Sequence, residues 1–108
     1  MSQWNIRYLP EAEQELAYLN RSIQPEILKG IRKVSQNPGY PDGYGKPLGN
    51  IAGTNLAGLY KIKFKKAGIR VVYGLEIKDT IMTVIVISAR ADNAVYAEAA
   101  KRRSKYQI

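Results

Sequence analysis

The pattern of apolar and polar residues divides the first third of the chain into one strand and two helices. Residues 3–8 alternate apolar and polar side chains, which predicts a half-buried strand. Pro10 is a favourable first residue for a helix, and apolar residues recur from there at helical spacing until Asn20. A second helical pattern begins at Pro25 and runs to Val34. These two segments predict a helical hairpin.

The second half of the chain predicts three strands and a final helix. The strands are expected at about 59–64, 69–77 and 80–88, with short turns between them. The last strand is apolar on both faces, which suits an inner position in a sheet. Asp92 or Asn93 can cap a helix that follows it. Before these strands, residues 37–58 hold six glycines and three prolines and predict a long irregular loop.

The expected fold class is therefore α+β. The order β-α-α-β-β-β-α describes an antiparallel four-stranded sheet with an N-terminal helical hairpin and a C-terminal helix. A chain of 108 residues, 45% of them hydrophobic, predicts one globular domain over 1–108. Its longest apolar run is about half of the roughly 18 residues that a membrane helix needs, and its N-terminus does not have the pattern of a signal peptide. We therefore expect a cytoplasmic protein with no membrane partner.

The charge and composition of the chain limit the ligands and the kinds of active site that it can have. The chain has 17 lysines and arginines against 9 acidic residues, a net charge of +8, which suits a polyanion such as nucleic acid, an anionic membrane surface or an acidic protein. It contains no cysteine and no histidine. A Ser-His-Asp triad, a two-histidine ribonuclease site, a thiolate nucleophile and the usual zinc sites are therefore excluded. Acid–base chemistry would fall to Lys, Arg, Tyr, Asp or Glu, and neither a metal nor a cofactor is expected.

A row of lysines marks the strand at 59–64. Apolar residues at positions 60, 62 and 64 alternate with Lys61, Lys63 and Lys65, which predicts one apolar and one cationic face. If residues 65–68 close a symmetric hairpin, Lys63 lies opposite Arg70, and directly opposed like charges are unfavourable. A phosphate bound there would reverse the sign of that interaction. The alternative is a solvated lysine face on a half-exposed sheet.

Four short motifs resemble the RelE toxins of the RelE/ParE superfamily. They are Tyr60-Lys61-Ile62-Lys63, then Gly68-x-Arg70-Val71-Val72-Tyr73, then Ile87-x-x-Arg90, then Val95-Tyr96. The similarity is close over residues 59–103. It is looser over the N-terminal strand, the helical hairpin and Lys46-Pro47-Leu48, which is similar to the family's basic loop. RelE toxins are ribosome-dependent mRNA interferases of bacterial type II toxin–antitoxin pairs. The resemblance implies an endoribonuclease that cuts mRNA in the A site of the 70S ribosome and is neutralised by a RelB-like antitoxin.

The resemblance also implies catalytic roles for five residues in a metal-independent reaction. The residues that match Lys61 and Lys63 help to deprotonate the attacking 2′-OH and hold the phosphate, and the one that matches Arg70 stabilises charge on it. The residue that matches Arg90 is the acid toward the leaving 5′-oxygen, and the one that matches Tyr96 stacks with and orients the mRNA. The products would be a 2′,3′-cyclic phosphate and a 5′-OH. Several fixed cations suit a phosphate that gains negative charge.

Activity on free RNA is expected to be weak. An arginine side chain is a poor acid, because its ordinary pKa exceeds about 12. Such a site would depend on the ribosome to hold the substrate in line. Contacts with ribosomal RNA phosphates, without sequence recognition, are expected from the remaining basic residues, namely Lys46, Lys65, Lys66, Arg102, Arg103 and Lys105.

One departure from the family pattern lies in the loop at 37–58. Relatives often carry further basic residues after the Lys-x-Leu, whereas this chain has Gly49 and Asn50, so the contact of this loop with the nucleotide stays open. Two other functions also remain. A ParE-like toxin that acts on DNA gyrase would need neither the two strand lysines nor Arg90. A non-catalytic RNA- or ribosome-binding module is hard to separate from an enzyme by sequence.

Overall fold

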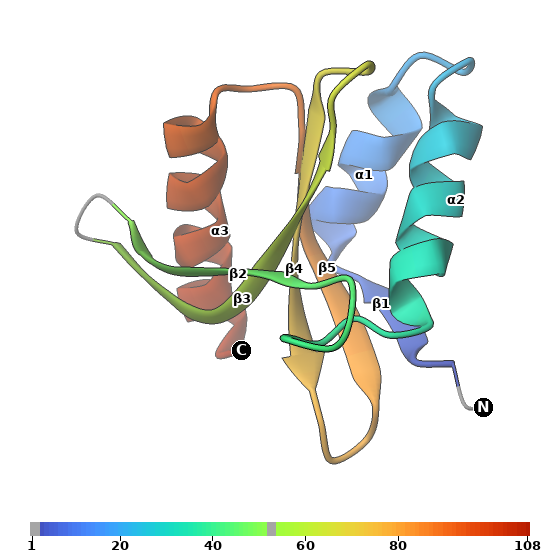
Figure 1. The fold of residues 1–108 in the computed structure, drawn as a ribbon. Coiled ribbons are helices and arrows are strands. Elements are labelled where there is room, and N and C mark those ends of the chain that lie inside the picture. Colours follow the sequence, from blue (N-terminus) through green and yellow to red (C-terminus); the bar gives the residue numbers. More distant parts are fainter. Residues whose placement is uncertain (1–2, 52–53) are drawn as a thin grey trace.

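A five-stranded sheet separates two layers of helices in a computed structural model that describes residues 3–51 and 54–108 (Figure 1). Helices α1 (Pro10–Tyr18) and α2 (Gln24–Ser35) lie on one face of the sheet, and α3 (Asp92–Tyr106) lies on the other. The spatial order of the strands is β1-β5-β4-β3-β2. Their bounds are Asn5–Tyr8 for β1, Lys46–Ile51 for β2, Thr54–Phe64 for β3, Ile69–Glu76 for β4 and Ile81–Ser88 for β5.

The predicted α+β class is confirmed, whereas the predicted number of strands is wrong. Over the described residues the sheet has five strands instead of four. Strands β2 to β5 pair antiparallel with their neighbours, and β1 pairs parallel with β5, so the sheet is mixed. The apolar β5 has the inner position that its sequence predicts, between β1 and β4.

The additional strand, β2, lies within the segment that was expected to be an irregular loop. Residues 46–51 pair with β3, which itself begins at Thr54; residues 52 and 53 lie outside the described residues. Because β2 is an edge strand, Pro47 can be accommodated without breaking the sheet. The register shifts between Pro47 and Gly49, where the φ angle of 67° at Gly49 suits a residue without a Cβ. Pairing with β3 therefore makes a strand from residues of low strand propensity.

The helices bury the apolar stripes that their spacing predicts. In α2, Ile27, Ile31 and Val34 point into the core at positions i, i+4 and i+7. On the sheet, the fully buried Tyr73 stacks on the ring of Tyr60, with 5.4 Å between the ring centroids. Its hydroxyl donates a hydrogen bond to the Pro38 carbonyl oxygen at 2.8 Å, which ties the segment after α2 to β4. None of the helices in the described ranges is both long and apolar enough to cross a membrane.

Candidate active site

Four cationic side chains lie on one face of the sheet, the face that α3 partly covers. The register places Lys63 opposite Arg70, which confirms the predicted hairpin, and it places Lys46 opposite Lys61 on the other side of β3. Directly opposed residues share a face, as do residues two apart along a strand. Lys46, Lys61, Lys63 and Arg70 therefore form one cluster, here called the cationic patch. The position of Lys46 beside Lys61 could not be predicted, because β2 was not expected.

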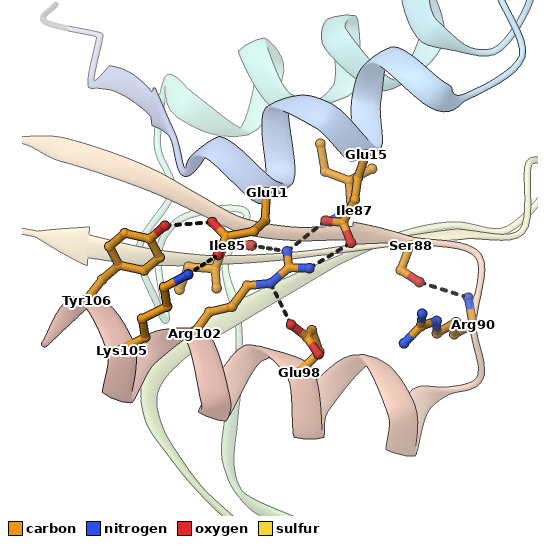
Figure 2. A network of polar contacts seen from close by, with 10 residues as sticks. All are labelled: Glu11, Glu15, Ile85, Ile87, Ser88, Arg90, Glu98, Arg102, Lys105 and Tyr106. Atoms are coloured by element: carbon orange, nitrogen blue, oxygen red, sulfur yellow. Dashed lines mark hydrogen bonds and ion pairs between the residues drawn. The ribbon is translucent and has the colours of Figure 1, made fainter.

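Arg90 lies on the connection between β5 and α3 (Figure 2). Its contact with Arg70 places it at the margin of the cationic patch. Its carbonyl oxygen accepts a hydrogen bond from Arg70 Nη1 at 3.0 Å, and its N–H donates to Ser88 Oγ at 3.1 Å. The side chain of Arg90 is exposed. Arg70 and Arg90, which are twenty positions apart in the sequence, are thus held together by the fold.

A carboxylate also lies within the cationic patch. Asp92 is the first residue of α3, with its Oδ2 3.4 Å from Lys63 Nζ and its Oδ1 in contact with Arg70 Nε. The expectation that Asp92 or Asn93 caps α3 is wrong, because the N-cap residue is Ala91 and no side-chain cap bond forms. Partial desolvation acts to raise the pKa of Asp92. The hydrogen bond from Lys63 and the charge of Arg70 outweigh this effect and hold that pKa below its ordinary value.

Tyr96 is buried one turn further along α3, with 4% of its surface exposed. Its hydroxyl makes no hydrogen bond to the described residues. Burial, together with the negative charge of Asp92, raises the pKa of this hydroxyl. In this conformation the ring cannot stack on a nucleotide. The role that the resemblance implies for Tyr96 would require the ring to become exposed.

Arg102 does not lie on the surface, so the expectation that it contacts RNA phosphates is wrong. Its guanidinium donates to both carboxylate oxygens of Glu15, at 2.8 and 2.9 Å, and its Nε donates to Glu98 at 2.8 Å (Figure 2). The side chain is only 9% exposed. A signal for this position existed in the sequence, since Val95, Ala99 and Arg102 follow the i, i+4, i+7 spacing of a buried stripe.

The other basic residues divide between two parts of the molecule. Lys65 and Lys66 are exposed on the turn between β3 and β4, directly after the strand that carries the patch lysines. Arg103 and Lys105 lie near the C-terminal end of α3, opposite to the end that begins with Asp92 (Figure 1). Lys105 pairs with Glu11 at 3.0 Å, and Arg103 Nε donates to the Ile108 carbonyl oxygen at 3.2 Å. These last two residues are separate from the cationic patch.

The patch is suited to binding an anion. It presents lysine and arginine donors on one partly exposed surface, and such donors form strong hydrogen bonds with phosphate oxygens. In the part of the chain that the structure describes, acidic side chains do not gather in groups of three or more that could hold a metal ion. Such a surface can bind a phosphate and stabilise negative charge on it.

Comparisons with known proteins show which proteins this chain resembles. No protein-family model matches the chain. A curated RelE-like toxin protein of Escherichia coli is 26% identical over 103 residues, which cover 93% of this chain and 97% of the relative.

Solved structures of RelE proteins share the fold. A mutant of the E. coli toxin RelE in its free state aligns with a TM-score of 0.69 at 24% identity, over 94% of this chain and 98% of that one. The toxin in a RelBE toxin–antitoxin complex from Mycobacterium tuberculosis gives 0.66 at 23% identity, over 85% and 97%. The chain is therefore similar in sequence to a RelE-like toxin protein and shares the fold of RelE proteins.

Proposed function

We propose that this protein is the toxin of a type II toxin–antitoxin pair and that it acts as a ribosome-dependent endoribonuclease, cleaving mRNA in the ribosomal A site. The observation that supports this proposal is the gathering of Lys46, Lys61, Lys63 and Arg70 on one face, with Arg90 at its margin. Like charges that lie side by side on a sheet favour the binding of an anion between them. A scissile phosphate would be such an anion.

Lys61, Lys63 and Arg70 of the patch, together with Arg90, then have parts in the reaction. The 2′-oxygen of the mRNA attacks the adjacent phosphorus while the bond from phosphorus to the 5′-oxygen breaks. One of Lys61 and Lys63, as a neutral amine, accepts the proton of the 2′-OH while the other holds the phosphate as a cation, and Arg90 supplies a proton to the leaving 5′-oxygen. Arg70 stabilises the charge that accumulates on the phosphate. The products are a 2′,3′-cyclic phosphate and a 5′-OH.

The ribosome and the antitoxin are the partners that we propose. The patch lies on a partly exposed surface, so a second body that holds the mRNA in line would provide much of the rate. Lys65 and Lys66, exposed beside the patch, suit contacts with ribosomal RNA phosphates. A RelB-like antitoxin is proposed because structural relatives occur in RelBE toxin–antitoxin complexes. The cytoplasm is the compartment in which these partners meet.

Mapping of cleavage sites in a purified translation system tests the nuclease. Wild type is compared with Arg90→Ala and Lys61→Ala, and with Lys78→Ala as a control for losing one exposed positive charge in the turn between β4 and β5. Arg90→Ala keeps both backbone hydrogen bonds of that residue, so the fold should be maintained. We expect cuts within A-site codons for wild type and Lys78→Ala, and a loss on the order of 100-fold for the other two variants.

Three results would contradict part or all of the proposal. Equal cleavage by all four proteins would remove Lys61 and Arg90 from the reaction. Absence of cleavage by wild type, with poisoning of DNA gyrase, would favour a ParE-like toxin, whereas ribosome binding without cleavage would favour a non-catalytic binding module.

A further inference from the structure

The carboxylate of Asp92 lies where an incoming phosphate would meet the cationic patch. We propose that Asp92 is an internal counter-ion which occupies the phosphate-binding position in the free protein, and which RNA has to displace. The identity of the displacing ligand as RNA rests on the proposed function. The occupation of the position rests on the geometry of three side chains.

Those three side chains form a bridge. One carboxylate oxygen of Asp92 contacts Arg70 Nε, and the other lies 3.4 Å from Lys63 Nζ. Lys63 and Arg70 are directly opposed across the hairpin, so the carboxylate joins two cations that would otherwise repel each other. A phosphodiester group also presents two free oxygens and one negative charge. It would therefore use the donors that Asp92 now engages.

The bridge is accessible to an incoming anion. The side chains of Lys63, Arg70 and Asp92 are 35%, 29% and 39% exposed. Ion pairs with this degree of exposure stabilise a fold only weakly, so exchanging one anion for another costs little. Asp92 also has no capping bond that would hold its side chain at the start of α3. The carboxylate is thus placed to leave when a phosphate arrives.

The counter-ion would weaken the binding of free RNA. With Asp92 in place, the pair formed by Lys63 and Arg70 carries a net charge of +1 instead of +2. A ribosome that presents mRNA directly to the patch would supply it at a high effective concentration, sufficient to compete with Asp92. RNA free in solution lacks this advantage. Asp92 would therefore increase the dependence of the toxin on the ribosome.

The test measures the affinity of the full-length protein for a fluorescent 2′-O-methyl RNA oligonucleotide, which cannot be cleaved because its attacking hydroxyls are blocked. Asp92→Asn is compared with wild type by fluorescence anisotropy at fixed salt. Asp79→Asn is the matched control, because it makes the same change of net charge in the turn between β4 and β5, at the other end of the sheet (Figure 1). We expect Asp92→Asn to bind about five- to tenfold more tightly, the effect of one screened charge at close range, and Asp79→Asn to stay within about twofold of wild type.

Equal affinity of the two variants would overturn the proposal. Weaker binding by Asp92→Asn would also overturn it and would make Asp92 a residue that positions Arg70. A second measurement needs no substitution: the side-chain ¹³C signal of Asp92 in the wild-type protein should shift as the oligonucleotide is added, and an unchanged signal at saturation would refute displacement. Ribosomal cleavage is a separate readout, so failure of the nuclease proposal would not remove the difference in affinity.

Discussion

Replacing Arg102 by alanine is expected to destabilise the protein strongly, because this side chain completes the edge of the sheet. Strand β1 pairs with β5 only as far as Val84. Beyond that point, Glu15 accepts a hydrogen bond from the Ile87 N–H at 3.1 Å, and Arg102 Nη1 donates to the Ile85 carbonyl oxygen at 2.8 Å (Figure 2). Glu15 and Arg102, which are paired with each other, thus take the place of a neighbouring strand along this part of β5. They also link α1 to α3 at this edge of the sheet.

The expected loss of stability follows from the burial of Arg102 and from the exposure of its two carboxylate partners. Removing one partner of a buried ion pair costs about 3–5 kcal/mol, because the other charge is left uncompensated. Arg102 is 9% exposed, but Glu15 and Glu98 are each 28% exposed and can be partly rehydrated. We therefore expect the lower end of the range, about 3 kcal/mol for Arg102→Ala. For a domain of this size that loss lowers the Tm by at least about 12 °C.

Chemical and thermal unfolding followed by circular dichroism measure this prediction. Lys101→Ala removes an exposed positive charge from the same helix and should change the free energy of unfolding by less than about 0.5 kcal/mol. The double variant Arg102→Met with Glu15→Gln should be more stable than Arg102→Met alone, because it leaves no unpaired carboxylate at Glu15. The reasoning is refuted if Arg102→Ala is no more destabilising than Lys101→Ala.

Two further predictions concern packing and pH. In the interior of a helix, alanine is normally more stabilising than glycine by about 1 kcal/mol. A Cβ at Gly30, however, would overlap the Phe64 ring. We therefore expect Gly30→Ala to destabilise the wild-type protein and to stabilise the Phe64→Ala variant, in which that ring is absent. Urea unfolding of the four proteins checks this, and the same sign in both backgrounds would contradict it. Hydrogen bonds from Tyr106 and Lys105, at 2.7 and 3.0 Å, lower the pKa of Glu11 to about 2, so its contribution to stability is present above pH 4.5 and is lost as the pH falls toward 2. Unfolding measured across this range should show a shallower pH dependence for Glu11→Gln than for wild type, and equal slopes would exclude this ion pair as a source of acid sensitivity.

The central part of the candidate site could be predicted from local sequence. Side chains of a strand alternate with a period of two, so Lys61 and Lys63 had to share a face wherever that strand lay. The length of the turn at 65–68 set the register, which brought Arg70 opposite Lys63. Arg90 and Tyr96, in contrast, were connected to the site only by the resemblance to RelE toxins. No local rule states where a residue beyond the end of a strand, or on the next helix, will lie.

The other features of the site could not be predicted from local sequence, because they depend on interactions between distant parts of the chain. The strand at Lys46 exists through pairing with β3, although its glycine and proline content favours a loop. The positions of the Asp92 and Arg102 side chains depend on how α3 is rotated about its own axis, and packing against the sheet sets that rotation. The first residue of the helix thereby brings its carboxylate to the cationic patch. The buried stripe of the helix brings Arg102 to Glu15. The sequence by itself determined that cations would line one face of a strand. Which of the basic residues stay available to a phosphate, and which are already paired with the protein's own carboxylates, was decided by the fold.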